Sequence, residues 1–276
     1  MPPLDPDNPR LVETVHRFTT LGIRFRDATT SGIVGDGLSA TAWPATATTA
    51  RRTAFRTSGH ALAFRGLPGL ASVEYPDGSP APTPRDYIIE VRDARRRFLP
   101  VAMRIALPLP YGGLYRPGGV GTPADFYLFS SPARAPLPAV AIVHATLEDA
   151  AHNTPAAWAM LEIAINGETF YGFSHTNGQV LAMFPYPAFT APPEHGPPVA
   201  GTMQTWALTV RVRAASTLPT LPGTPLPDFA AMSTQPFATI EATDGGTPQN
   251  SLNATLTFGE PLTLQTAGRS TLRIHT

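Results

Sequence analysis

The sequence contains no cysteine and no lysine, so all 20 of its basic residues are arginine. A chain without cysteine forms no disulfide and offers no thiol nucleophile and no thiolate ligand for zinc or an iron–sulfur cluster. A chain without lysine forms no Schiff base and lacks the lysine of P-loop and kinase nucleotide sites. These absences exclude much covalent and nucleotide chemistry, and we expect no bound cofactor.

Charge is also scarce, at 14% of residues, and the 20 acidic and 20 basic residues cancel to a formal net charge of zero. A protein that binds duplex nucleic acid normally carries a basic excess, so we expect no nucleic-acid partner. No apolar run is long enough to cross a membrane as a helix, and the first ten residues lack the apolar core of a secretory signal. We therefore expect synthesis in the cytoplasm and no direct insertion into a membrane.

Proline and glycine are abundant instead, at 32 and 23 of the 276 residues. Between the turns that they indicate, apolar residues recur at every second position, which is typical of half-buried antiparallel strands. The clearest of these runs are 21–25, 38–43, 89–91, 101–107, 139–147, 159–165, 208–212 and 256–258. One short helix is expected at residues 228–234, with Asp228 as its N-cap. The sequence therefore predicts an all-β fold with little helix.

The longest proline-rich stretch, residues 108–138, divides the chain into two parts, because proline cannot donate to a sheet ladder. We predict two transthyretin-like or Ig-like β-sandwich domains in tandem. Their expected limits are an amino-terminal extension at 1–10, a first sandwich at 11–108, a Pro/Gly-rich linker at 109–137 and a second sandwich at 138–276.

A short internal echo accompanies this division. Residues 59–68 and 178–187 share Gly, Leu, Ala and a final Pro at a constant offset of 119 positions. Asp27 and Asp149 also follow the first predicted strand of each half. Duplication of one domain and convergence of two sandwiches on the same turn chemistry both explain the match.

No motif in the sequence carries recognisable catalytic or metal chemistry. The seven histidines include no pair at the helical spacing of a zinc protease, and the nucleophile elbow, phosphate loop and calcium loop are all missing. His144, beside Val143 in a predicted strand, is best explained as a half-buried structural residue, and His175 falls in a predicted turn. We predict no catalytic, cofactor-binding or metal-binding residues, and a protein that is not an enzyme.

Two groups of residues are candidates for contacts with a partner. Arg95, Arg96 and Arg97 belong to the one dense charge run, which lies between two predicted strands and indicates a hairpin turn. The run serves either as a contact for an anion or a partner, or as a solvated turn. The second group consists of aromatic residues in proline-rich loops, which form either packed lids or exposed anchors. These residues are Tyr111, Tyr115, Tyr186 and Phe189.

Several segments of the first half resemble the transthyretin-like (prealbumin-like) β-sandwich. The resemblance is carried by residues 26–32, 37–43, 57–59 and 64–69. In that family a strand is followed by an Asp-x-x-x-Gly turn, a second strand, a glycine turn and a strand that ends in a leucine–proline corner. The resemblance implies a structural or binding module.

A longer ordered set of motifs looks like proteins encoded in gene clusters for extracellular contractile injection systems, the phage-tail-like particles of bacteria. It includes Gly66-Leu67-Pro68-Gly69-Leu70, Leu128-Phe129-Ser130-Ser131-Pro132, Phe184-Pro185-Tyr186-Pro187, Leu256-Thr257-Phe258-Gly259 and shorter matches at 97–100, 155–159, 227–229 and 235–236. The resemblance implies a structural component of the particle, at its cap or baseplate, with other protein subunits as partners. It also implies an extracellular location for the released particle.

Two alternatives remain open: a module that binds a carbohydrate or a cell surface, and an enzyme such as a toxin cargo, which a pocket that brings two or more histidines together with a carboxylate would indicate. Many β-sandwiches bind carbohydrates or cell surfaces through exposed aromatic side chains, and such a module would use tyrosine and tryptophan as stacking platforms. Trp43, Trp158 and Trp206 each fall in or beside a predicted strand, which favours burial in a core instead. Self-association into a homo-oligomer is compatible both with a particle component and with a binding module.

Overall fold

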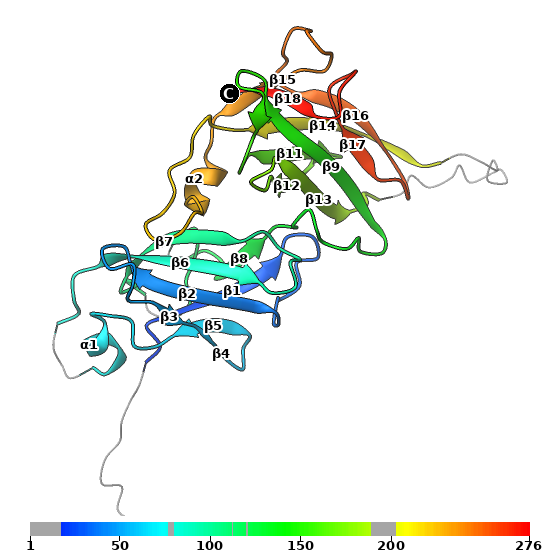
Figure 1. Ribbon diagram of the computed structural model, residues 1–276. Helices are drawn as coiled ribbons and strands as arrows, with labels where there is room; N and C mark the ends of the chain where they lie inside the picture. Colours follow the sequence, from blue (N-terminus) through cyan, green and yellow to red (C-terminus); the bar gives the residue numbers. More distant parts are fainter. Residues whose placement is uncertain (1–17, 77–79, 112, 120, 189–202) are drawn as a thin grey trace, which may run out of the picture.

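The computed structural model describes residues 18–76, 80–111, 113–119, 121–188 and 203–276. These residues form eighteen strands and two short helices, and the strands fall into a lower and an upper half (Figure 1). The all-β fold class is confirmed, and so is the short helix at Asp228, whose carboxylate accepts a hydrogen bond from the Ala230 amide at 3.2 Å.

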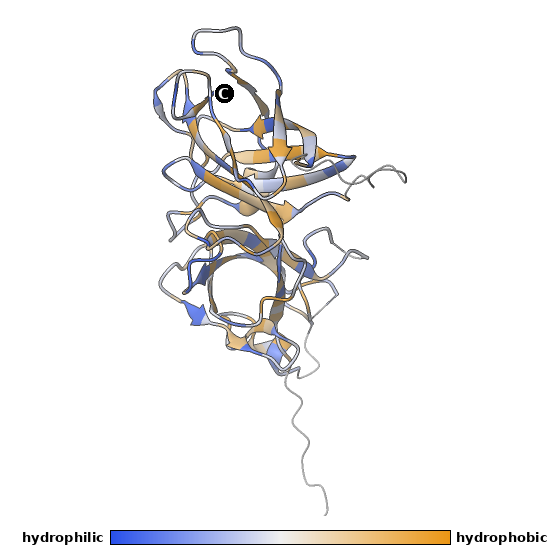
Figure 2. Cartoon of the chain, turned by 90° about the vertical axis from the view of Figure 1, so that its right-hand side faces the viewer, coloured by the Kyte–Doolittle hydropathy of each residue, from blue (hydrophilic) through white to orange (hydrophobic). Residues whose placement is uncertain are grey.

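The first half contains two four-stranded sheets, with strand orders β4-β5-β1-β8 and β3-β2-β6-β7. The strands of the first sheet are β1 (Leu21–Asp27), β4 (Phe55–Arg56), β5 (Ala61–Phe64) and β8 (Asp125–Leu128). Those of the second sheet are β2 (Leu38–Pro44), β3 (Arg52–Thr53), β6 (Arg85–Asp93) and β7 (Val101–Leu107), and helix α1 (Ala71–Glu74) follows β5. Alternate side chains of both sheets meet in one hydrophobic core, and the strands surround it when the half is viewed end-on (Figure 2).

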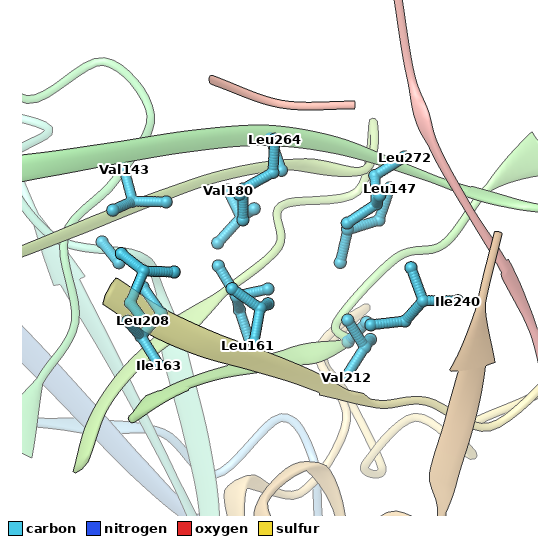
Figure 3. Close-up of a cluster of buried hydrophobic side chains, with 14 of the residues drawn as sticks. Val143, Leu147, Leu161, Ile163, Val180, Leu208, Val212, Ile240, Leu264 and Leu272 are labelled. Atoms are coloured by element: carbon cyan, nitrogen blue, oxygen red, sulfur yellow. The ribbon is translucent and has the colours of Figure 1, made fainter. Parts of the chain in front are cut away.

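In the second half the strands join into one larger sheet system, with the order β10-β9-β18-β15-β14-β11-β12. Strands β13 and β17 also pair with β9, and β16 pairs with β14. The elements are β9 (Val140–Asp149), β10 (Thr154–Pro155), β11 (Met160–Ile165), β12 (Glu168–Phe173), β13 (Gln179–Pro185), β14 (Thr205–Arg213), α2 (Phe229–Ser233), β15 (Phe237–Ile240), β16 (Leu252–Thr257), β17 (Leu262–Leu264) and β18 (Leu272–His275). Side chains from β9, such as Val143 and Leu147, face Leu161 and Leu208 across a second hydrophobic core (Figure 3).

The two halves follow the same strand plan. Strand β1 pairs antiparallel with β5 and parallel with β8, and strand β9 pairs antiparallel with β13 and parallel with β17 and β18. Strand β2 lies between β3 and β6 as β11 lies between β12 and β14. Each first strand ends in an aspartate whose carboxylate accepts from the amide two residues on, at 2.8 Å for Asp27 and 3.0 Å for Asp149. The echo between residues 59–68 and 178–187 thus lies on equivalent strands, β5 and β13, as a duplication would place it.

A third hydrophobic cluster lies between the halves. Its members are Trp43, Ile88, Leu99, Ala102, Trp158, Met160, Phe173, Leu221, Leu226 and Met232. Helix α2 lies between the two sets of strands and supplies Met232 (Figure 1). Only Trp206 lies in a sandwich core, whereas Trp43 and Trp158 pack in this junction. The halves are therefore joined by a packed apolar interface, while their division into domains at the limits given above stays a prediction.

The predicted linker, residues 109–137, contains strand β8. Phe126 and Leu128 are buried in the first core, and β8 runs parallel to β1 from Asp125↔Arg24 to Leu128↔Asp27. The strand is only four residues long and lies between proline-rich segments, so its alternation is too brief to stand out in the sequence. The linker prediction therefore does not hold for residues 125–128, which complete the first sheet.

Candidate interaction groove

The arginine run lies in the connection between β6 and β7, where the sequence predicts a hairpin turn. Asp93, the last residue of β6, organises this turn. Its carboxylate accepts hydrogen bonds from the amide of Arg97 at 2.8 Å, the amide of Arg95 at 3.3 Å and the Nε of Arg97 at 3.0 Å. Its carbonyl accepts from the amide of Arg96 at 3.0 Å. A single aspartate therefore fixes the backbone of the turn from Asp93 to Arg97.

The electrostatics of the turn keep Asp93 ionised. Burial raises the pKa of its carboxyl, but the hydrogen bonds from the side chain and amide of Arg97 and the amide of Arg95 outweigh burial, so the pKa lies below its ordinary value. The same contact stabilises the charged form of Arg97, because the hydrogen bond to Asp93 raises the pKa of the guanidinium. The turn is thus held by an ion pair at neutral pH.

The charge run spans residues 92–97 and contains four arginines, of which Arg92, Arg95 and Arg97 are paired with carboxylates. Arg95 Nη1 lies 2.6 Å from Asp36 Oδ2, and Arg97 Nη1 lies 3.3 Å from Asp36 Oδ1. Arg92 pairs with Glu90. Within the described ranges, Arg96 has no carboxylate at ion-pair distance, and its backbone has a φ of +55°, in the left-handed region that favours glycine. Arg96 is therefore an exposed, uncompensated charge on a strained backbone.

Arg92, Asp93, Ala94 and Arg96 form one wall of a groove of about 750 Å³ at the boundary between the halves. The remaining lining residues are Ser39, Phe98, Pro100, Ser131, Pro132, Ala133, His175 and Gln179. His175 and Gln179 lie on either side of the turn between β12 and β13, where the His175 amide donates to the Gln179 carbonyl at 2.8 Å. The groove is thus built from segments of both halves.

The groove residues next to the arginine turn are held by two further arginine contacts. The Phe98 ring contacts two guanidinium groups, with the Arg97 Cζ 5.3 Å and the Arg134 Cζ 4.9 Å from its centre. Arg134 is buried and forms a bidentate ion pair with Asp27. Sequence reasoning singled out Asp27 but missed Arg134 and Asp36, because isolated charges in loops give no signal of the distant groups that they contact.

The loop tyrosines named from the sequence do not line this groove. The Tyr111 hydroxyl accepts from the Arg116 amide at 3.1 Å, and Tyr115 packs against the first core, where burial raises the pKa of its hydroxyl. Tyr186 packs against Trp206 and Phe258, with ring centres 5.4 and 4.8 Å apart. All three are half-buried. Phe189 lies outside the described residues.

His144 and the three tryptophans, which the sequence also singled out, are packed within the protein. His144 is half-buried on β9, and burial lowers the pKa of its imidazole. The three tryptophans are at most 8% exposed. In the described part of the chain, no three His, Asp or Glu side chains gather closely enough to hold a metal ion. The helices among the described residues are too short to cross a membrane.

None of the protein-family models matches this chain, and no curated protein sequence is significantly similar to it. Among solved structures, the major pilin subunit BcpA of Bacillus cereus is 10% identical, with a TM-score of 0.22, over 73% of this chain and 41% of the pilin. The shaft pilin SpaA of Lactobacillus rhamnosus GG is 11% identical, with a TM-score of 0.23, over 95% of this chain and 98% of the pilin. A Ca²⁺-stabilized, ice-binding adhesin of an Antarctic bacterium is 12% identical, with a TM-score of 0.17, over 90% of this chain and 50% of the adhesin. At TM-scores this low the likenesses carry no argument about function.

Proposed function

We propose that this chain is a non-enzymatic structural component of a phage-tail-like contractile injection particle, placed at its cap or baseplate, and that it acts through protein–protein contacts. In this proposal the particle is assembled in the cytoplasm and then released. The motifs shared with proteins of such gene clusters motivate the proposal. The single structural observation that supports it is the groove at the boundary between the halves, which would seat a segment of a neighbouring subunit.

The composition of the groove suits a protein contact. Small-molecule pockets are lined mainly by apolar and aromatic side chains. This groove has a mixed lining with one aromatic residue, Phe98, four alanine and proline residues, and seven polar residues: two arginines, an aspartate, two serines, a histidine and a glutamine. Arginine is enriched at protein interfaces. The turn is also held in place by Asp93 and Asp36, and a preorganised surface loses less conformational entropy when it binds.

The carbohydrate-binding alternative receives less support. The tryptophans that could serve as stacking platforms are buried, and the three described loop tyrosines are half-buried against the protein itself. Sugar binding by stacking needs an exposed ring face, and the exposed tyrosines Tyr127 and Tyr171 lie on strands β8 and β12 rather than among the loop residues that the sequence offered for this role.

The test is incorporation into a particle. An affinity-tagged chain is produced together with the sheath, tube and baseplate proteins of a contractile injection system, and particles are isolated by sedimentation. We expect the chain in the particle fraction at a fixed ratio to the baseplate proteins. A chain that stays monomeric and never sediments with particles overturns the proposal.

A matched pair of variants tests the groove itself. Ala94→Trp places a large side chain in the groove, and Ala207→Trp makes the same change at an exposed position of β14. We expect Ala94→Trp to lose incorporation and Ala207→Trp to retain it, with both variants unfolding at the temperature of the unaltered chain. Equal incorporation of both variants would show that the groove is not the contact site.

A further inference from the structure

We infer that the groove binds an acidic segment of a partner protein, with a carboxylate of that segment held by the guanidinium of Arg96 and supported by Arg92. The inference rests on the proposed function, since it names the chemistry of the partner at that contact.

The charges around the turn do not cancel. Arg92, Arg95, Arg96 and Arg97 face three carboxylates, those of Glu90, Asp36 and Asp93. The other charged groups beneath the groove, Arg134 and Asp27, neutralise each other. One positive charge is left over, and the ion-pair geometry assigns it to Arg96. A carboxylate from a partner protein would neutralise this remaining positive charge.

The backbone at Arg96 gives an independent reason. A left-handed residue in a tight turn is normally glycine, which has no Cβ to crowd the following carbonyl oxygen, or asparagine, whose side chain offsets that cost by hydrogen-bonding locally. An arginine at a φ of +55° therefore does not serve the turn. Strained residues of this kind persist where their side chain has a use, and here the side chain lines the groove.

Guanidinium geometry suits a carboxylate in particular. Arginine presents its N–H donors as a planar fork that can bind both oxygens of a carboxylate at once. Arg92 lies on the same wall, with 56% of its side chain exposed, and is bound to Glu90 through its Nε, so among the described residues its terminal nitrogens are left for a second acceptor. The two arginines can therefore hold one acidic side chain from two directions.

The rest of the groove suits the chain around that acidic residue. Pro100 and Pro132 supply an apolar surface beside the buried Phe98, and Gln179 on the other half supplies a side-chain Nε2 that can donate to a peptide carbonyl, while its Oε1 accepts from Asn177 Nδ2 at 2.9 Å. A volume of about 750 Å³ is larger than one carboxylate requires and admits a short extended segment. Phosphate groups also bind arginine. A nucleic-acid site normally carries a cluster of many unpaired basic residues, whereas this net-neutral chain has one unpaired arginine at the groove.

A peptide titration tests the ligand class. The probes are two short peptides of identical leucine, proline and serine content, one with two glutamates and the other with glutamines in their place. Binding to the full chain is followed by NMR, through the amide and arginine Nε–H signals. We expect the glutamate peptide to shift signals of the groove and to bind about tenfold more tightly than the glutamine peptide, as one charge-assisted contact would give.

The matched variants are Arg96→Gln and Arg56→Gln, which change exposed arginines inside and outside the groove. We expect the first to weaken binding of the glutamate peptide about tenfold and the second to leave it unchanged. Equal binding of both peptides, or no effect of Arg96→Gln, overturns the inference. A single-stranded oligonucleotide that binds through Arg96 while the glutamate peptide does not would also overturn it, in favour of phosphate.

The particle assay separates this inference from the proposed function. Incorporation of the Arg96→Gln chain at the unaltered level, together with loss of the Ala94→Trp chain, would leave the groove as the contact site but refute the acidic segment. Incorporation of both variants would refute the groove as the contact site.

Discussion

Asp27 and Arg134 form a buried ion pair that ties the end of β1 to the segment after β8. Arg134 Nη1 lies 3.0 Å from one oxygen of Asp27 and Nη2 lies 2.5 Å from the other, and both side chains are at most 10% exposed. Arg134 also donates to the Ser130 hydroxyl at 3.1 Å. Because Ser131, Pro132 and Ala133 line the groove, this pair holds one groove wall against the first sheet.

Removal of the charge of Asp27 should therefore cost stability. Asp27→Asn leaves the buried guanidinium of Arg134 without its counter-charge, and we expect the free energy of unfolding to fall by about 3 kcal/mol. Asp86→Asn is the control, because Asp86 pairs with Arg104 at the surface with about half of each side chain exposed, and surface pairs contribute about 0–1 kcal/mol. Urea unfolding of the three chains measures the difference. Similar losses in the two variants would contradict the prediction.

The same pair makes stability depend on pH. Burial raises the pKa of Asp27, but the hydrogen bond from Arg134 and that from the Thr29 amide outweigh it, so the pKa in the folded chain is below its ordinary value. A carboxyl with a lowered pKa stabilises the fold above its unfolded pKa of about 4, and that contribution is lost as the pH falls through the folded pKa. We expect urea unfolding to show stability that declines from about pH 5 toward pH 3. The decline should be shallower for Asp27→Asn, and parallel curves would assign the pH dependence to other groups.

Much of the fold could be predicted from the sequence because its signals are local. The alternation along 139–147 and 208–212 predicts strands that the structure has as β9 and β14, and Pro227 with Asp228 predicts helix α2. Helix α1 (Ala71–Glu74) was not predicted, since it is one turn long and Leu70 at its N-cap gives no side-chain hydrogen bond. Short elements of this kind depend on tertiary packing rather than on local preference.

The groove could be predicted only in part. The arginine run is visible as a charge cluster, but the groove depends on contacts between segments far apart in the chain. His175 and Gln179 come from the second half, and Arg134 lies 107 positions from Asp27. No pattern in a single sequence encodes which loop charges meet. The unusual backbone of Arg96 is equally invisible, because an arginine in a turn does not indicate the sign of φ.

Replacement of Arg96 by glycine should stabilise the fold while it removes the proposed contact. Glycine adopts a positive φ without a steric penalty, so Arg96→Gly relieves strain worth about 1 kcal/mol, offset in part by the greater entropy of an unfolded chain with an added glycine. We expect a net gain of about 0.5 kcal/mol. Arg95→Gly, the neighbouring change, breaks the contact with Asp36 and should give no gain. Urea unfolding at neutral pH checks both, and a loss of stability in Arg96→Gly would show that the side chain serves the turn after all.

The turn between β12 and β13, which forms the other side of the groove, depends on Gly178. Its φ is +77°, and a Cβ there would lie 2.3 Å from the carbonyl oxygen of Leu147, a backbone atom that cannot move aside. Gly167 provides the control, because it has a similar φ of +83° but nothing within 4 Å of its Cβ position. We expect Gly167→Ala to cost about 1 kcal/mol, for the left-handed conformation alone. Gly178→Ala should cost about 2 kcal/mol more, since the clash with β9 adds overpacking. Thermal and urea unfolding of both variants separates the cost of the left-handed backbone from the cost of the clash. Equal losses of stability in the two variants would mean that the β12–β13 turn is free to move away from β9.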